Sequence, residues 1–268
     1  MMPMQEVPIR RCANPISLVH VPKSTRAVLC IHGYTGYPGE LALPAKRLHE
    51  AGFDVFVPRL PGHGTNGEDF LRSTRESWLS CARNSYEDLA KRYDRVSLVG
   101  HSMGGAIAAI LSATYDAGPC VLYAPALSIP ALKPLALHVF GLFAKRKKVA
   151  WKSDPRYRFF DERDADDDAF LGSEYWSWLY IPQLKALLSI VKEAASSIGR
   201  THNDILVITG GLDVTVGSDV GPMVVEQGKG KNNWIHLPDA THLIPYDIDD
   251  RSREDAMERT VAWMRWDD

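Results

Sequence analysis

The chain has 268 residues, of which 45% are hydrophobic, so it can bury a sizeable core and fits one large α/β domain. With 31 Lys and Arg against 33 Asp and Glu, the net charge of −2 provides no overall basic field for holding nucleic acid or an anionic membrane. The four cysteines are far apart and form no CxxC pair, so we expect free buried thiols rather than a zinc or redox site.

Short apolar runs alternate with helical patterns along most of the chain. Helical patterns cover 41–50 and 73–93, the latter opening with a Ser73-x-x-Glu76 capping box, and a final helix is expected around 254–266. This alternation predicts an α/β fold with a mostly parallel, doubly wound sheet. Buried strands are predicted where short runs rich in Val, Ile and Leu are bounded by glycine or charged residues, at 27–31, 53–58, 96–99, 120–123, 205–209 and 234–237.

The alternation breaks between Ala126 and Arg200, a gap far longer than an ordinary connection between two strands. We therefore predict a core domain of residues 1–125 and 201–268, with an inserted cap, or lid, of residues 126–200. The composition of the insert is unusual, with a basic run at 145–148, an acidic run at 161–168, and an aromatic cluster of Tyr175, Trp176, Trp178 and Tyr180.

The segment Gly100-His101-Ser102-Met103-Gly104 matches the pattern G-x-S-x-G, directly after the predicted strand 96–99 and before a helical run of small residues. A serine on such a sharp turn needs neighbours with minimal side chains, which the glycines supply. The N-terminus of the following helix would also direct backbone N–H groups toward negative charge beside Ser102. We therefore predict that Ser102 is a nucleophile; the alternative is a glycine-rich turn without chemistry.

A serine hydroxyl becomes a good nucleophile only when a base removes its proton, so the mechanism needs a histidine oriented by a carboxylate, usually in the chain order Ser, Asp, His. Asp213 follows the strand 205–209 through two glycines, at the edge where open α/β sheets collect functional residues. Asp204 precedes that strand and Asp219 lies further along the chain, so both are weaker candidates than Asp213.

His242 is the best candidate for the base among nine histidines, because it lies in a loop between the last predicted strand and the final helix. His236 falls within that strand and His202 precedes another, so each is more simply a structural or surface residue. The alternative for His242 is a loop histidine satisfied by local hydrogen bonds.

A tetrahedral intermediate needs two N–H donors for its oxyanion, one after the nucleophile and one from the loop after an early strand. We expect these donors to be the backbone N–H groups of Met103 and of Tyr34, which lies in the glycine-containing loop 32–36. His32 is expected to orient this loop rather than to act in catalysis. A further glycine loop, 61–64, is open to two interpretations, a tight turn or a direct contact with substrate.

These motifs together resemble those of bacterial carboxylesterases and monoacylglycerol lipases of the α/β-hydrolase superfamily. The resemblance runs from about residue 27 to the C-terminus and implies the α/β-hydrolase fold and hydrolysis of carboxylic esters without a cofactor. It also implies a triad of Ser102, Asp213 and His242, with Tyr34 and Met103 as oxyanion donors. The matching segments are His32-Gly-Tyr-Thr-Gly, Pro61-Gly-His-Gly, Gly100-His-Ser-Met-Gly-Gly, Gly211-Leu-Asp and Thr241-His.

The sequence therefore predicts a serine carboxylic-ester hydrolase that acts on a small-molecule ester without metal or cofactor. The same triad could serve a thioesterase or an acyltransferase, and the fold could also be a catalytically silent binding protein. Residues 1–30 lack a basic region followed by a long apolar run, and no stretch approaches about 18 uninterrupted apolar residues. We expect a cytoplasmic protein with no nucleic-acid partner and no stable membrane insertion; monomer and dimer both remain open.

The substrate prediction depends on the cap. Trp176, Trp178 and Tyr180 are expected to contact substrate, although these aromatic residues could equally form the cap's own small core. A second apolar stretch, at 132–143, gives the cap more hydrophobic surface than it needs for itself, so part of the cap's apolar surface is expected to line a pocket. Because each buried methylene contributes about 0.8 kcal/mol, we expect a preference for short-to-medium-chain esters, including monoacylglycerols.

Overall fold

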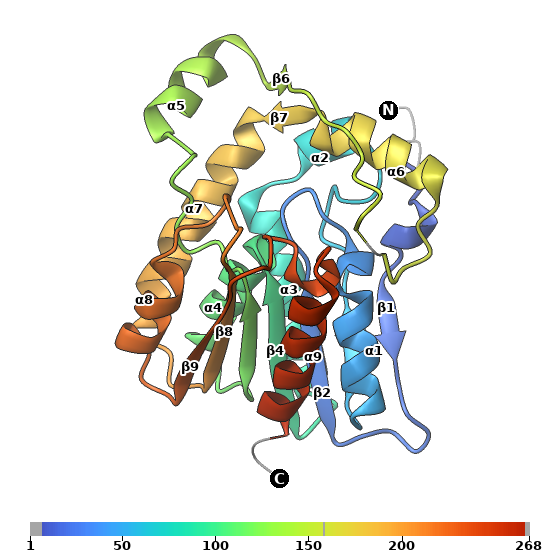
Figure 1. The fold of residues 1–268 in the computed structure, drawn as a ribbon, viewed down its shortest axis with the longest axis vertical. Coiled ribbons are helices and arrows are strands. Elements are labelled where there is room, and N and C mark those ends of the chain that lie inside the picture. The colour runs from blue at the N-terminus through green and yellow to red at the C-terminus, as the bar shows by residue number, and fades with distance from the viewer. Residues whose placement is uncertain (1–6, 158, 266–268) are drawn as a thin grey trace.

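The computed structural model describes residues 7–157 and 159–265 of the chain. Its centre is a seven-stranded sheet in which all neighbouring strands run parallel, except that β1 at one edge is antiparallel to β3 (Figure 1). The order across the sheet is β1 (Ile16–Leu18), β3 (Asp54–Val57), β2 (Arg26–Ile31), β4 (Arg95–His101), β5 (Cys120–Tyr123), β8 (Ile205–Gly210) and β9 (Asn232–Leu237).

All six predicted strands are present, and the mostly parallel α/β fold class is confirmed. Every residue of β5 is buried, as are Ala27–Ile31 of β2, because helices cover both faces of the sheet at these strands. β1 was not predicted, since three residues are too few to establish a pattern. It is specified by pairing instead, with Ile16 opposite Val57 at the sheet edge.

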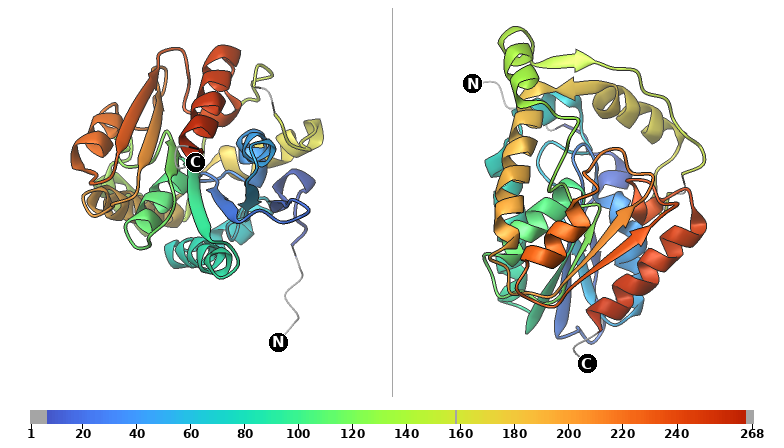
Figure 2. Two further views of the ribbon diagram at one scale, coloured as in Figure 1. Left: turned by 90° about the horizontal axis from the view of Figure 1, so that it is seen from below. Right: turned by 60° about the vertical axis from the view of Figure 1, so that its left-hand side comes forward.

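Helices cover both faces of the sheet (Figure 2). On one face α1 (Ala42–Glu50) packs against α9 (Asp250–Met264), and on the other α4 (Met103–Ser112) packs against both α3 (Arg75–Ala90) and α7 (Ile181–Ile198). Every residue of α4 is buried, which explains why the run of small residues after Ser102 is so apolar. The remaining core helix, α8 (Val220–Gln227), lies against β8 and β9.

The predicted capping box at the start of α3 is wrong by one residue. Thr74 is the N-cap, and its side chain and that of Ser77 each accept a hydrogen bond from the other residue's backbone N–H. Ser73 instead follows an unpredicted short helix, α2 (Gly67–Arg72), and its hydroxyl donates to the carbonyl of Phe70 at 2.6 Å. Ser73 therefore belongs to the end of α2, whereas the sequence pattern assigned it to the start of α3.

The insert between β5 and β8 begins with α5 (Pro134–Phe143), β6 (Arg146–Lys148) and α6 (Ala165–Leu171), followed by a π-helical turn (Gly172–Trp176) and β7 (Trp178–Tyr180). β6 and β7 pair as a two-stranded antiparallel sheet. These elements lie together beyond one end of the sheet (Figure 1), whereas α7 packs against α4 within the core layer. The division at 126 and 200 stays a prediction, and the packing of α7 favours ending the cap near residue 180. We refer to residues 126–180 as the cap segment.

Two general expectations can be compared with the described residues. The cysteines are free; Cys12, Cys30 and Cys120 are buried, whereas Cys81 is half-buried against the carbonyl of Arg59. Among the helices of the described part of the chain, none combines the length and the apolar character needed to cross a bilayer.

Candidate active site

Ser102 lies on the sharp turn between β4 and α4, with backbone angles φ 54° and ψ −116°. A positive φ is unusual for a residue with a side chain, and strained conformations of this kind cost about 1–3 kcal/mol. The turn is held by its neighbours, because the Ser102 N–H donates to the carbonyl of Tyr123 at 2.9 Å and the Ala126 N–H donates to the carbonyl of Ser102 at 2.9 Å. β5 and the loop after it therefore fix the strained residue in place.

Close packing around Ser102 requires the glycines of its motif. A Cβ on Gly100 would lie 2.6 Å from the Cα of Gly105, and a Cβ on Gly104 would lie 2.6 Å from the carbonyl oxygen of His32. Both distances are far inside the usual separation of non-bonded heavy atoms, so even alanine would force the turn, the helix or the neighbouring loop to move. The spacing of the glycines thus has a direct steric cause.

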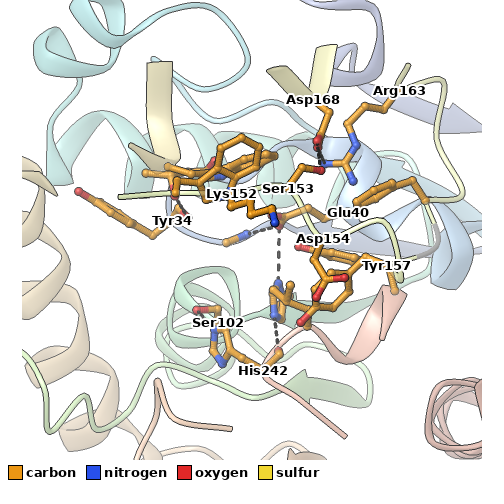
Figure 3. Close-up of a pocket in the computed structure, with 18 residues that line it drawn as sticks. Tyr34, Glu40, Ser102, Lys152, Ser153, Asp154, Tyr157, Arg163, Asp168 and His242 are labelled. Carbon is orange, nitrogen blue, oxygen red and sulfur yellow. Dashed lines mark hydrogen bonds and ion pairs between the residues drawn. The ribbon is translucent and has the colours of Figure 1, made fainter. Parts of the chain in front are cut away.

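The structure brings Ser102, His242 and Asp213 together at the carboxyl edge of the sheet. Ser102 and His242 lie at the wall of the neighbouring cavity (Figure 3). The Ser102 hydroxyl donates to Nε2 of His242 at 2.9 Å, and the Nδ1–H of His242 donates to Oδ2 of Asp213 at 2.7 Å. Since an ionised carboxylate can only accept, Asp213 selects the tautomer that leaves Nε2 free to receive the serine proton.

Asp213 is held by its own loop as well as by His242. The backbone N–H groups of Thr215 and Val216 donate to Asp213 Oδ1 at 2.7 and 3.2 Å. Burial by itself would raise the pKa of Asp213, but the hydrogen bond from His242 and these two N–H groups outweigh burial and lower this pKa below its usual value. The carboxylate is therefore ionised at neutral pH.

Burial also sets the protonation of His242, whose side chain is 15% exposed. Desolvation penalises the imidazolium and lowers the pKa of His242 below 6.5, although the hydrogen bond to Asp213 opposes this shift. The ring is thus neutral at pH 7, the state that a general base requires.

The weaker candidates from the sequence lie elsewhere. Asp204 accepts the N–H of Lys231 at 2.7 Å just before β8, at the opposite edge of the sheet from Ser102. Asp219 directly precedes α8, His236 contacts the hydroxyl of Thr209 from β9, and His202 is exposed before β8. Their positions leave Asp213 and His242 as the residues that meet Ser102.

The loop after β2 carries Tyr34, the expected second oxyanion donor. The next residue, Thr35, has φ 56°, so the backbone turns sharply there. Met103 is the first residue of α4, where an N–H has no partner within the helix. Within the described part of the chain, the N–H groups of Tyr34 and Met103 have no hydrogen-bond acceptor, so both are available to a ligand.

A buried histidine, His32, holds this loop in place. His32 donates from Nδ1 to the carbonyl of Gly33 at 3.0 Å, and its Nε2 accepts the N–H of Leu60 at 3.1 Å. Burial, with the neighbouring charge of His63 next in importance, lowers the pKa of His32 to about 3. His32 therefore stays neutral and ties the loop after β2 to the loop after β3.

The glycine loop 61–64 forms a tight turn. Gly62 and Gly64 have φ values of 78° and 68°, a region that favours glycine. His63, between them, donates to the carbonyl of Pro61 at 3.1 Å and packs against Trp78. The loop does not belong to the walls of the cavity beside Ser102 in the described structure, which favours the structural interpretation.

A cavity of about 350 Å³ opens beside Ser102 and His242, and core and cap line it together (Figure 3). Aromatic residues contribute much of its wall, namely Tyr34, Trp151, Tyr157, Phe159, Trp176 and Tyr246. Charged side chains also line the cavity, namely Glu40, Lys152, Asp154, Arg163 and Asp168. The cavity is therefore more polar than the sequence suggested.

Of the three cap aromatics expected to contact substrate, Trp176 lines this cavity, and its Nε1–H donates to the carbonyl of Thr35 at 3.3 Å. Trp178 and Tyr180 do not line it in the described structure. The indole of Trp178 donates to the carbonyl of Ser173 at 3.0 Å, and Tyr180 is buried against Phe70. The positions of Trp178 and Tyr180 agree with the alternative interpretation, in which the cap aromatics stabilise the cap itself and its contact with the core.

Part of the cap's apolar surface lines the cavity, as expected, but the stretch 132–143 does not contribute to it in the described structure. This stretch forms α5, in which only Leu137 is buried, while Leu135, Leu142 and Phe143 are 76%, 69% and 83% exposed. On the side of the cap, most of the lining comes from described residues of 151–157 and 159–163, whose mixture of aromatic and charged residues has no helical or strand periodicity. A periodicity search therefore could not select it.

Two functional candidates were missed at the sequence level, Glu40 and His101. Both are buried beside the triad, and their side chains face each other. Two signals were available: His101 directly precedes the nucleophile, and Glu40 is the only acidic residue in the otherwise uncharged segment 32–45.

A parallel sheet that presents a hydrogen-bonded serine, histidine and aspartate at its carboxyl edge defines a class of hydrolases. The model of the family described as "Alpha/beta hydrolase family" matches residues 28–261, and the chain belongs to this family.

Curated relatives match shorter parts of the chain. A thermostable monoacylglycerol lipase from Bacillus sp. (strain H-257) is 33% identical over 129 residues, which is 48% of this chain and 50% of the relative. A carboxylesterase from Bacillus subtilis (strain 168) is 31% identical over 81 residues, or 30% of this chain and 33% of the relative. These matches thus span half or less of the relatives' lengths.

Solved structures match over nearly the whole chain. A structure described under the metagenome-derived lipolytic enzymes LipS and LipT has a TM-score of 0.82 at 22% identity, covering 97% of this chain and 100% of that one. The monoacylglycerol lipase of Paleococcus ferrophilus has a TM-score of 0.70 at 17% identity, covering 94% and 97%. At these identities the likeness establishes the fold.

Proposed function

We propose that this protein is a serine carboxylic-ester hydrolase, with Ser102 as nucleophile, His242 as general base and Asp213 as the residue that orients the base. The observation that carries the proposal is the continuous pair of hydrogen bonds, 2.9 and 2.7 Å long, from Ser102 through His242 to Asp213 at the wall of a cavity. Matches to a monoacylglycerol lipase and a carboxylesterase add support.

The mechanism follows from this geometry. Nε2 of His242 takes the proton of Ser102 as Oγ attacks the ester carbonyl carbon, and the carbonyl oxygen becomes an oxyanion. The free N–H groups of Met103 and Tyr34 would stabilise this charge. The protonated His242 then gives its proton to the leaving alcohol, and water, activated by the same ring, releases the acid from the acyl-enzyme.

The cavity favours esters of short-to-medium acyl chains, including monoacylglycerols, over bulky triacylglycerols. Its volume of about 350 Å³ lies at the lower end of common ligand pockets. Its aromatic wall would hold an apolar acyl chain, and Lys152 and Asp154 would lie beside a polar alcohol. We also propose that the reaction needs neither metal nor cofactor and that the protein is cytoplasmic.

A fluorophosphonate probe together with a panel of p-nitrophenyl esters and monoacylglycerols tests the proposal. We expect covalent labelling at Ser102, loss of labelling in Ser102→Ala, and kcat/KM values that rise with chain length and then fall. An unlabelled wild-type protein would contradict the serine mechanism. Faster turnover of matched thioesters than of oxygen esters would assign the triad to a thioesterase instead.

A further inference from the structure

His101 lies between a backbone carbonyl, which can only accept a hydrogen bond, and the carboxyl group of Glu40, which can only accept when it is ionised. Its Nε2–H donates to the backbone carbonyl of His242 at 2.9 Å, and its Nδ1 faces Oε2 of Glu40 at 3.6 Å. Both side chains are buried, with exposures of 2% and 7%. A buried imidazole with acceptors on both sides needs a proton on each nitrogen.

Glu40 has the environment of an ionised carboxylate. The same Oε2 accepts the backbone N–H of Gly33 at 3.1 Å, so it is already committed as an acceptor. Burial alone would raise the pKa of Glu40, but the close approach of His101, together with His32 and the Gly33 N–H, outweighs burial and lowers this pKa. A neutral His101 would instead point a lone pair at the carboxylate, which is repulsive.

The pair connects three pieces of backbone that the proposed reaction uses. Glu40 lies on the 3₁₀ turn Pro38–Leu41 and holds Gly33, the residue before the expected oxyanion donor Tyr34. His101 ends β4 directly before Ser102 and holds the main chain of His242. A shift of either partner would therefore move the base and the oxyanion loop relative to the nucleophile.

We propose that Glu40 and His101 form a buried carboxylate–imidazolium pair and act as positioning residues, locking the main chain of His242 and the oxyanion loop to the nucleophile turn. The pair rests on the proposed function, since what it positions is the candidate triad. Both residues border the cavity, and the role proposed for them is to hold other groups in place. Its contribution is orientation, to which rates are sensitive because small misplacements of catalytic groups cost large factors.

The charge of the pair can be measured without catalysis. In Ser102→Ala protein with ¹⁵N-labelled histidine, we expect both ring nitrogens of His101 to carry protons at pH 7, with the signal assigned by its loss in His101→Asn. Adding Glu40→Gln should leave one protonated nitrogen. A neutral His101 ring in the Ser102→Ala protein would overturn the pair, whatever the protein hydrolyses.

Kinetics test the positioning role. Glu40→Gln preserves the shape and removes the charge, so kcat should fall about tenfold or more while KM stays within about twofold. Glu40→Asp, which keeps the charge, should recover part of kcat. Glu87→Gln is the matched control, because Glu87, on α3, accepts the hydroxyl of Tyr115 at 2.6 Å, does not line the cavity in the described structure, and should alter stability alone.

The outcomes separate this proposal from the proposed function. Unchanged kcat in folded Glu40→Gln would overturn the positioning role while Ser102 remained labelled by the fluorophosphonate. If Glu40→Gln fails to fold, His101→Asn carries the kinetic test, with the same fall in kcat expected and unchanged kcat again overturning the role; Glu40→Asp should then retain a higher kcat than His101→Asn. Absence of labelling at Ser102 in the wild type would instead overturn the proposed function, and the role of the pair in it.

Discussion

The carboxyl edge of the sheet and the cap segment 126–180 differ in how their side chains are held in place. At the sheet edge, Ser102, Asp213 and His242 follow buried strands or lie in loops tied by backbone hydrogen bonds, and their mutual distances are set by the core. The cap is joined to the core through side-chain contacts, such as the hydrogen bond that the Tyr175 hydroxyl donates to the carbonyl of Gly62. It also exposes apolar side chains on α5.

This difference suggests separate roles for the two regions: the sheet edge would determine the rate of the reaction, and the cap would determine which ester is preferred. Positions built on rigid elements keep reacting groups in register, whereas a cover of short elements and irregular chain can change its lining without disturbing the groups below. Substitutions at the sheet edge should therefore alter kcat, and substitutions in the cap should alter which ester is preferred.

Removing the nucleophile gives the largest expected effect. Ser102→Ala should lower kcat by about 10⁶-fold, because the attacking oxygen is lost while the fold keeps its packing. Steady-state assays on a p-nitrophenyl ester, with thermal unfolding as a check of folding, measure this. A folded variant retaining a few per cent of activity would move the chemistry away from the sheet edge.

Removing the orienting carboxylate of Asp213 should have the second largest effect on kcat. Asp213→Asn should lower kcat by about 10⁴-fold, because the amide can donate to Nδ1 and favour the wrong tautomer of His242. Asp219→Asn, a few residues away at the start of α8, is the matched control and should leave kcat unchanged. Equal losses in both variants would mean that the loop, and not the hydrogen bond, matters.

Substitutions in the cap should change the preference for acyl-chain length, in contrast to substitutions at the sheet edge. Trp176→Ala should lower kcat/KM for the preferred chain length by roughly tenfold, since part of an aromatic wall worth about 1.5–3 kcal/mol is lost. Trp178→Ala should leave the chain-length profile unchanged, because this indole lies outside the cavity. A chain-length series of both variants measures this, and identical profiles would contradict the assignment of Trp176 to the substrate wall.

The smallest expected effect is a displacement of the pH profile. His242 acts only when neutral, and burial lowers its pKa, so activity should be lost as pH falls through a midpoint below 6.5. A profile of kcat/KM against pH in buffers of constant ionic strength measures this midpoint. A midpoint above 6.5 would mean that Asp213 raises the pKa of His242 more than burial lowers it.

The sequence predicted the core well because its signals are local. Buried parallel strands are short apolar runs, and the sharp turn at Ser102 needs glycines at Gly100 and Gly104 for steric reasons visible in the motif itself. The cavity wall was not predictable in this way. The segment 151–163 reaches the triad through tertiary placement, and the apolar pattern of α5 gave no sign that its side chains would face outward.

The backbone of Ser102 has a consequence for evolution under selection for stability. Its φ of 54° is tolerated by glycine at almost no cost, so Ser102→Gly would release strain of about 1–3 kcal/mol against a backbone entropy cost of about 0.5–1 kcal/mol. The expected result is an inactive protein that melts at a higher temperature. A screen for thermal tolerance alone would therefore select against the nucleophile, and the most active form of this chain is not its most stable one.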